Sequence, residues 1–294
     1  MATSLARREP WLAPLLLLFL PVGIFLLFIV IPIFQSIWIS FFEWDGTGPK
    51  TWVGLGNYAE LIQDEQFLVS LKNNIIWLLL FLLAPAFGLA LALFLNQTIG
   101  GMRLIKSLFF IPLVLAHVII AVVFAWFYDP TFGPIAIAMN WLGLKPIAIL
   151  SDDRFVTLGI VVAGLWSQIA FCLVLFLAGL SQIDHELIAA GRIDGAQGWT
   201  MLRYVVLPQL RSVSFIATII TVIGSLRNFD LIAVMTQGGP YGSSTVLAYQ
   251  MYDATIFSYR AGYGAAIAVV LFMIMSVYIA WFLRRTLAHE GRGV

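Results

Sequence analysis

Long apolar runs recur along the whole chain and limit what it can fold into. Each approaches the ~20 residues that a helix needs to cross the hydrocarbon core of a bilayer. With 61% hydrophobic residues and a mean hydropathy of +0.97, the chain is far more apolar than a soluble domain. The sequence therefore predicts an all-α integral membrane protein with a single transmembrane domain over residues 1–294. Its six spans are expected at approximately 11–33, 75–95, 108–128, 156–180, 213–234 and 261–283.

The first apolar run begins in the way that a signal peptide does. It follows Arg7 and Arg8, but it is longer than the apolar region of a signal peptide and no A-x-A-like cleavage site ends it. We therefore expect this run, from Trp11 onward, to be retained as the first span.

The distribution of Lys and Arg between the connecting segments predicts the orientation. The N-terminus, the segments 96–107 and 181–212 and the C-terminal tail together hold Arg7, Arg8, Arg103, Lys106, Arg192, Arg203, Arg211, Arg284, Arg285 and Arg292. The opposite side holds only Lys50, Lys72, Lys145, Arg154 and Arg260. Both termini and the segment 181–208 are therefore predicted to be cytoplasmic. On the outer side, residues 135–142 are expected to form a short helix, lying along the membrane interface or packed over the helix ends.

The segment 181–208 is mostly polar and separates two apolar runs. Asp184 is suited to N-cap a short helix, with Glu186 in its first turn. Gly195 stands where a turn or a helix stop is needed. On that helix the apolar residues share one side, namely Leu187, Ile188 and Ile193. An ordered segment at the membrane surface indicates a docking surface for another protein, and a solvated linker is the alternative interpretation.

Polar residues interrupt two of the predicted spans. Arg227, Asn228 and Asp230 lie in the fifth, where each ionised group costs about 2.5–3.5 kcal/mol at the bilayer centre and must face protein or water. Three residues apart on a helix, the two charged groups share a face and can pair with each other. Trp166, Ser167 and Gln168 in the fourth span combine a flat ring with two hydrogen-bonding groups, and Trp166 and Gln168 are the candidates for a substrate site. A polar substrate site is one interpretation; a self-satisfied ion pair and simple packing of Trp166 are the alternatives.

Enzyme and nucleic-acid functions find little support. His185 and Glu186 begin like the zinc motif H-E-x-x-H, but the second His is missing, and His117 is expected only to bond a neighbouring backbone carbonyl. The sequence has no phosphate-binding G-x-x-x-x-G-K-[ST] loop and no G-x-S-x-G motif. Cys172 is the only cysteine, so a cysteine-based metal site and an intrachain disulfide are excluded. A net charge of +1 gives no reason to expect nucleic acid.

Two motifs resemble those of permeases from binding-protein-dependent ABC importers. The cytoplasmic segment is similar to the family pattern E-A-A-x-x-x-D-G-A followed by L-P, at Ala190, Asp194, Gly195, Ala196, Leu207 and Pro208. It departs at the first position, where the family has Glu and this chain has Ala189; the nearest acid is Glu186. The pattern F-D-x-I-x-x-x-T-x-G-G-P with a later G-Y-x-A-A is similar at Phe229, Asp230, Ile232, Thr236, Gly238, Gly239, Pro240, Gly262, Tyr263, Ala265 and Ala266. The run Gly54–Tyr58 also resembles an external loop of the carbohydrate-type, MalF-like subunits.

The resemblance implies a transport subunit of a bacterial cytoplasmic (inner) membrane that imports a sugar, a glycoside or a polyol. It implies two ATPase subunits that bind ATP and Mg, a second and non-identical permease, and an extracytoplasmic solute-binding protein, with no cofactor or metal on this chain. The implied coupling residues are Glu186, Ala190, Asp194, Gly195 and Ala196, and the implied substrate path includes the polar part of the fifth span. A secondary transporter or channel subunit is the alternative, disfavoured because no inverted repeat or acidic relay is evident. An intramembrane enzyme ranks third.

Overall fold

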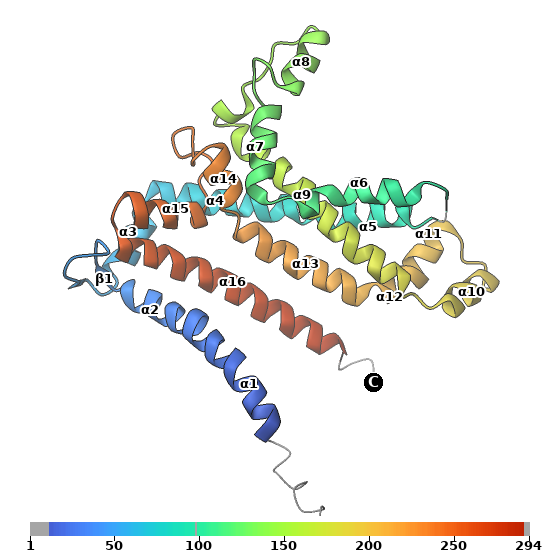
Figure 1. Cartoon of the computed structure of the whole chain (residues 1–294), viewed down its shortest axis with the longest axis horizontal. Coiled ribbons are helices and arrows are strands. Elements are labelled where there is room, and N and C mark those ends of the chain that lie inside the picture. The colour runs from blue at the N-terminus through green and yellow to red at the C-terminus, as the bar shows by residue number, and fades with distance from the viewer. Residues whose placement is uncertain (1–11, 98, 291–294) are drawn as a thin grey trace, which may run out of the picture. The chain divides into compact units, whose positions relative to one another are not determined.

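The computed structural model describes residues 12–97 and 99–290, which fall into two compact units. The first contains the described residues up to Gln63 together with Met251–Phe272, and the second contains Asp64–Gln250 and the described residues from Met273 onward. Helices make up most of both units (Figure 1). Four residues named above lie outside the described residues. They are Arg7, Arg8 and Arg292, which were used to predict the orientation, and Trp11, the predicted start of the first span.

The first unit begins with one long apolar helical segment. α1 (Leu12–Phe25) continues through a π-helical turn (Leu26–Val30) into α2 (Ile31–Ile39). The π turn directly precedes Pro32, which has no backbone N–H to donate and crowds the preceding turn. The helix therefore extends beyond the predicted end of this span at residue 33. The remaining elements of the unit are β1 (Phe42–Glu43), β2 (Thr51–Trp52), α3 (Gly56–Gln63), a π turn at Asp253–Phe257 and the first part of α16 (Ala261–Glu290).

Hydrogen bonds order the segment that follows α2. β1 and β2 pair antiparallel with Phe42 opposite Trp52. The amide of Asn57 in α3 donates to the carbonyl oxygens of Ser40 at 2.8 Å and Phe42 at 2.9 Å. The backbone N–H groups of Gly48 and Thr47 bond the Asp45 carboxylate and lower its pKa from the ordinary value. The segment is therefore a folded loop.

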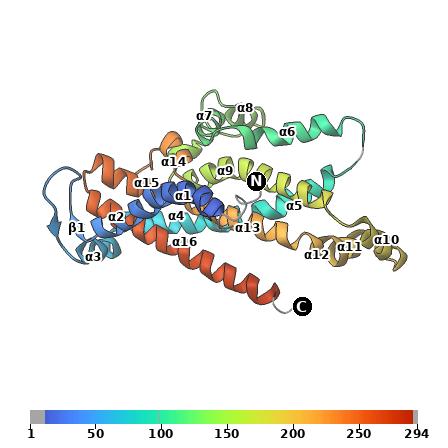
Figure 2. The same cartoon turned by 60° about the horizontal axis from the view of Figure 1, so that its bottom comes forward.

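The second unit contains the remaining helices. They are α4 (Glu65–Phe81), α5 (Leu83–Leu95), α6 (Met102–Val114), α7 (His117–Phe127), α8 (Pro134–Trp141), the 3-10 turn Ile149–Ser151, α9 (Val156–Ser181), α10 (His185–Ile193), α11 (Gly198–Met201), the π turn Leu202–Val206, α12 (Leu207–Gln209), α13 (Arg211–Leu226), α14 (Asp230–Met235), α15 (Leu247–Tyr252, shared with the first unit) and the rest of α16. α8 confirms the short helix predicted near 135–142. Figure 2 shows α10, α11 and α12 following one another beyond the end of α9.

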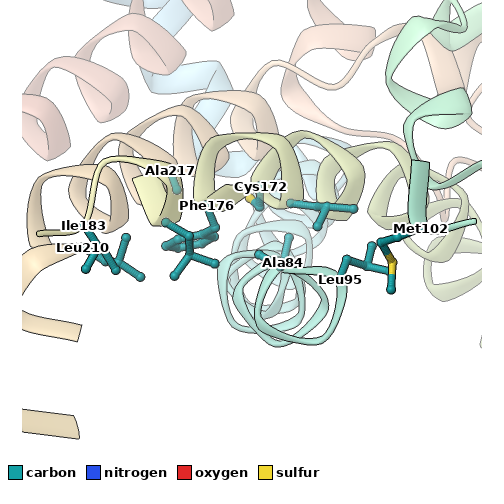
Figure 3. Close-up of a cluster of buried hydrophobic side chains, with 11 residues drawn as sticks. Ala84, Leu95, Met102, Cys172, Phe176, Ile183, Leu210 and Ala217 are labelled. Carbon is teal, nitrogen blue, oxygen red and sulfur yellow. The ribbon is translucent and has the colours of Figure 1, made fainter. Parts of the chain in front are cut away.

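The core of the second unit lies mainly between α5 and α9. Cys172, Leu173 and Phe176 of α9 are buried against Ala84, Ala92 and Leu95 of α5 (Figure 3). The helices approach closely because Gly88 has no side chain: a Cβ there would fall 2.5 Å from the Cβ of Cys172. The buried thiol of Cys172 is thus part of the packing between these helices.

Five helical segments of the described residues are long and apolar enough to cross a membrane, and the bent pair α6–α7 makes a sixth if it counts as one span. The all-helical membrane bundle is therefore confirmed. The second segment begins at Glu65 rather than near residue 75. Asp64 caps its start by accepting a hydrogen bond from the Gln66 N–H at 2.9 Å, and polar residues further along are bonded as well. The amide of Asn73 donates to the Ser243 carbonyl oxygen at 2.7 Å, and the Asn74 side chain accepts from the Leu247 N–H at 2.9 Å.

Two predicted spans are not continuous helices, although both fall on candidate membrane-crossing segments. The third bends by 102° between α6 and α7, because Leu115 and Ala116 have extended backbones with ψ of 135° and 142°. The fifth is interrupted after Leu226, and α14 begins at Asp230. The remaining spans agree with α9 and α16, whereas the assignment of 1–294 to one domain stays a prediction.

Candidate functional site

A cavity of about 300 Å³ lies in the second unit, between α4, α7, α9, α13 and the start of α14. Four of the five residues predicted for a substrate site line it: Gln168, Arg227, Asn228 and Asp230. The rest of its wall includes Phe81, His117, Gly164, Ser167, Ile220, Ile223, Gly224, Phe229 and Leu231. The structure therefore brings polar residues from the fourth and fifth predicted spans to one place.

The break between α13 and α14 positions three of these polar residues. The N–H of Arg227 still bonds the carbonyl oxygens of Ile223 and Gly224, both at 3.2 Å, and closes the last turn of α13. Asp230 starts the next helix. Arg227 and Asp230 thus belong to different helices, so the prediction that they share a helix face was wrong.

The charged pair does not neutralise itself within the described part of the chain. The ion pair found there joins Arg260 and Glu60 of the first unit at 2.6 Å, and the hydrogen bond that Arg260 donates to Glu60 raises the pKa of Arg260. Arg227 and Asp230 make no comparable contact, and both side chains are exposed in this chain. A self-satisfied Arg227–Asp230 pair is therefore not the explanation for these residues.

A second layer of polar contacts holds the glutamine of the cavity. Nε2 of Gln168 donates to Oγ1 of Thr221 on α13 at 2.8 Å, and the buried Thr221 hydroxyl lies 3.6 Å from the Cys172 Sγ. The Gln168 Oε1 atom has no hydrogen-bond partner among the described residues, and it lies 3.6 Å from where a Cβ on Gly224 would be. This arrangement leaves the amide oxygen as an acceptor at the cavity wall.

Trp166 is not part of the cavity wall. Its ring packs on Phe124 of α7, with centroids 5.6 Å apart, so the alternative of simple packing describes it better. The structure instead places Ser167 and His117 on the wall, and no bond from His117 to a neighbouring carbonyl occurs among the described residues. His117 was missed because its position depends on the bend before α7, which no residue pattern in the sequence indicates.

The predicted cytoplasmic helix forms as α10, with both of its ends capped. The Asp184 side chain accepts a hydrogen bond from the Glu186 N–H at 2.8 Å, which confirms the N-cap. At the other end Gly195 has a left-handed φ of +81°. Its N–H donates to the Arg192 carbonyl oxygen at 3.1 Å, and the N–H of Ala196 donates to the Gly191 carbonyl oxygen at 2.8 Å. This pair of bonds is a Schellman motif, which ends the helix at Asp194.

The sequence predicted that the apolar residues of this helix share one side, but they do not all face the protein interior. Ile188 packs against the core cluster of the second unit, whereas Leu187 is 50% exposed and Ile193 is 87% exposed. Further along, Trp199 and Tyr204 are also exposed. The assignment of the family's Glu position to Ala189 was wrong, because the spacing of the pattern counted back from Asp194 puts it at Ile188. An apolar residue therefore packs inward where the family pattern has an acid, and the exposed surface is a mixture of apolar side chains and charged side chains of both signs.

Comparison with known proteins identifies the family. Residues 75–289 match the family model described as "Binding-protein-dependent transport system inner membrane component". The chain belongs to this family. It is thus a permease of a binding-protein-dependent ABC importer, a component that does not itself hydrolyse ATP, and the alternatives of a secondary transporter, a channel and an enzyme no longer apply.

Relatives of the permease match it along nearly the whole chain. A probable ABC transporter permease of Pyrococcus horikoshii is 34% identical, with 97% of this chain and 100% of the relative covered. The alpha-glucoside transport permease AglF of Rhizobium meliloti is 32% identical, with 96% and 84% covered. The permease also has the fold of a bacterial ABC transporter involved in the import of the acidic polysaccharide alginate, at a TM-score of 0.83, 22% identity, and 95% and 96% coverage. These matches confirm its similarity to MalF-like sugar permeases.

Proposed function

We propose that the permease imports a sugar, a glycoside or a polyol, and that the cavity between α4, α7, α9 and α13 binds this solute during transport. The observation that carries the proposal is the set of polar groups on the cavity wall. Arg227 donates, Asp230 accepts, and the amides of Asn228 and Gln168 do both. Sugar hydroxyl groups donate and accept as well, so fixed groups of both kinds are what such a ligand requires.

The relatives support the solute class. Three relatives are permeases named for alpha-glucoside, for trehalose and maltose, and for sulfoquinovosyl glycerol. Each is at least 30% identical to this chain, with at least 84% of each chain covered. The cavity wall holds both the cation of Arg227 and the carboxylate of Asp230. The charge of the wall is therefore compatible with a neutral solute and with an anionic one. The common chemistry of the named substrates is a glycosidic solute, which fits the donors and acceptors of the wall.

We further propose that the segment from Asp184 to Pro208 docks on one of two partner ATPase subunits, which bind ATP and Mg. In this proposal a second, non-identical permease completes the membrane part, and an extracytoplasmic protein delivers the solute. Support comes from the capped helix α10, from the left-handed turn at Gly195, and from the exposure of Ile193 and Trp199. Exposed apolar and aromatic side chains beside cations are typical of protein interfaces. We place the assembly in the bacterial cytoplasmic membrane with both termini inside.

A ligand screen on the purified transporter tests the solute assignment. The permease is isolated with its partners, and stimulation of ATP hydrolysis is measured over a panel of glucosides, disaccharides, polyols and amino acids, with the solute-binding protein present. Stimulation by glycosidic solutes or polyols is the expected result. A response to amino acids alone would contradict the proposal.

Variants of the cavity then test the site. Asp230→Asn removes a charged acceptor, whose hydrogen bonds are worth about 1.5–3 kcal/mol, so the solute concentration for half-maximal stimulation should rise by about tenfold or more. Asn228→Ala should raise it by less, because neutral hydrogen bonds contribute about 0.5–1.5 kcal/mol. Basal ATP hydrolysis and assembly should stay unchanged. Asp253→Asn and Asn140→Ala are matched controls, since neither residue lines the cavity; equal effects in variants and controls would refute the site.

A further inference from the structure

A second and larger cavity of the same unit, about 700 Å³ in volume, lies between α4 from Val69 to Leu80, the start of α9 with the two residues Asp153 and Arg154 before it, and the turn after α14. Its wall combines charged and apolar side chains. Lys72, Asp153 and Arg154 line it together with several aliphatic residues. No residue proposed to bind the solute belongs to this wall, so the cavity calls for a different ligand.

The charged and apolar residues of the wall lie at different depths along the helices. Lys72 precedes the apolar run 75–95 by three residues, or about 4.5 Å of helix, and Arg154 lies two residues before α9 begins. Both cations are therefore at the level where an apolar span meets the headgroup region. Leu79 is about 10 Å further along α4, and it is 61% exposed, while Leu158 on α9 is 44% exposed. The cavity is thus charged at one end and apolar towards the membrane interior.

The uncharged polar groups of the wall are mostly occupied. The amide nitrogen of Asn73 donates to the carbonyl oxygens of Ser243 at 2.7 Å and Thr245 at 2.8 Å. The Thr157 hydroxyl is directed to the Asn73 Oδ1 atom and to the same Ser243 carbonyl. The Ser243 hydroxyl is buried without a partner within the described residues. A sugar requires many fixed donors and acceptors, and the hydroxyls of Ser243 and of the fully exposed Tyr241 do not provide them.

We propose that this cavity binds a phospholipid of the surrounding bilayer. The phosphate lies between Lys72 and Arg154, and an acyl chain runs along Leu79 and Leu158. The Lys72 ammonium and the Arg154 guanidinium make no hydrogen bond or ion pair within the described part of the chain, so they are available to a phosphate. With Asp153 the charged end carries a net +1, which complements a headgroup of net charge −1 such as phosphatidylglycerol.

Lipid titration of the assembled transporter tests the phosphate contact. The complex with its partner subunits is examined by native mass spectrometry with added phosphatidylglycerol, and with diacylglycerol of the same acyl chains, which lacks the phosphate. The wild type should retain phosphatidylglycerol in preference. A surface cation attracts an anionic headgroup with a strength equivalent to about a fivefold change in affinity, so Lys72→Gln and Arg154→Gln should each weaken retention by that factor.

Lys145→Gln is the control, because this exposed cation is on the same predicted side of the membrane but outside the cavity wall. Retention in the Lys72 and Arg154 variants equal to that of the wild type would overturn the proposal, as would equal retention of both lipids by the wild type. If the variants fail to assemble, a photoreactive p-benzoylphenylalanine in place of Leu79 decides the question. Cross-linking to lipid supports the proposal, whereas cross-linking only to a neighbouring subunit would show that protein covers this cavity.

Discussion

Replacement of Gly195 tests whether the turn after α10 transmits the energy of ATP hydrolysis. A Cβ at this position would meet no atom within 4 Å, so the Cβ of Gly195→Val has room. A cost arises from the backbone, whose φ is +81°. An L-residue in the left-handed region costs about 1–2 kcal/mol, and a β-branched residue is a clear outlier there. A penalty of ~2 kcal/mol lowers the population of the native turn by about thirtyfold.

Gly195→Asn is the matched control, because Asn adopts the left-handed conformation with little strain and is the second most common residue at this position of a helix end. Both variants are reconstituted with partner subunits, and ATP-driven uptake is measured at equal amounts of inserted permease. We expect uptake to fall strongly for Val and to be largely kept for Asn. Equal loss of uptake in both variants would mean that any side chain at this position disturbs the docking surface, whatever the conformation of the turn. Normal uptake in the Val variant would mean that the segment is only a linker.

Three further predictions concern topology, the site and packing. In right-side-out vesicles a single Cys at Gln197 should resist an impermeant thiol reagent, whereas one at Thr51 should react; the reverse pattern would overturn the orientation. Thr221→Val should raise the solute concentration for half-maximal ATPase stimulation a fewfold at unchanged maximal rate, with recovery in Thr221→Ser, because the cavity glutamine loses its anchor; no shift would limit this contact to packing. Gly88→Ala should destabilise the unit by about 1–3 kcal/mol through overpacking, seen as a lower melting temperature, whereas Gly23→Ala should be neutral, since its Cβ meets nothing within 4 Å.

Local signals in the sequence were sufficient where the structure depends on neighbouring residues. Asp184 begins α10 and Gly195 ends it because a side-chain acceptor and a left-handed turn are needed within a few positions of each other. The apolar runs likewise gave the approximate places of the membrane-crossing segments. Composition, however, does not indicate whether the backbone of a run is continuous. The polar residues in the middle of α4 depend on long-range contacts, because Asn73 and Asn74 make hydrogen bonds with residues about 170 positions away in the chain.

The break in the fifth span is itself evidence for a wet or protein-lined interior, independently of which side chains it carries. Backbone N–H and C=O groups that leave a helix within a membrane find no partners in lipid, so irregular backbone occurs there only where it is buried in protein or lines a water-filled cavity. At this break the amide of Asn74 is directed at the Leu226 carbonyl oxygen, at the long distance of 3.5 Å. The side chains of Arg227 and Asp230 flank the interruption and line the cavity. The unpaired backbone groups of the break and the charges of Arg227 and Asp230 both need polar partners. Both kinds of group lie at the same cavity, where a polar solute can contact them.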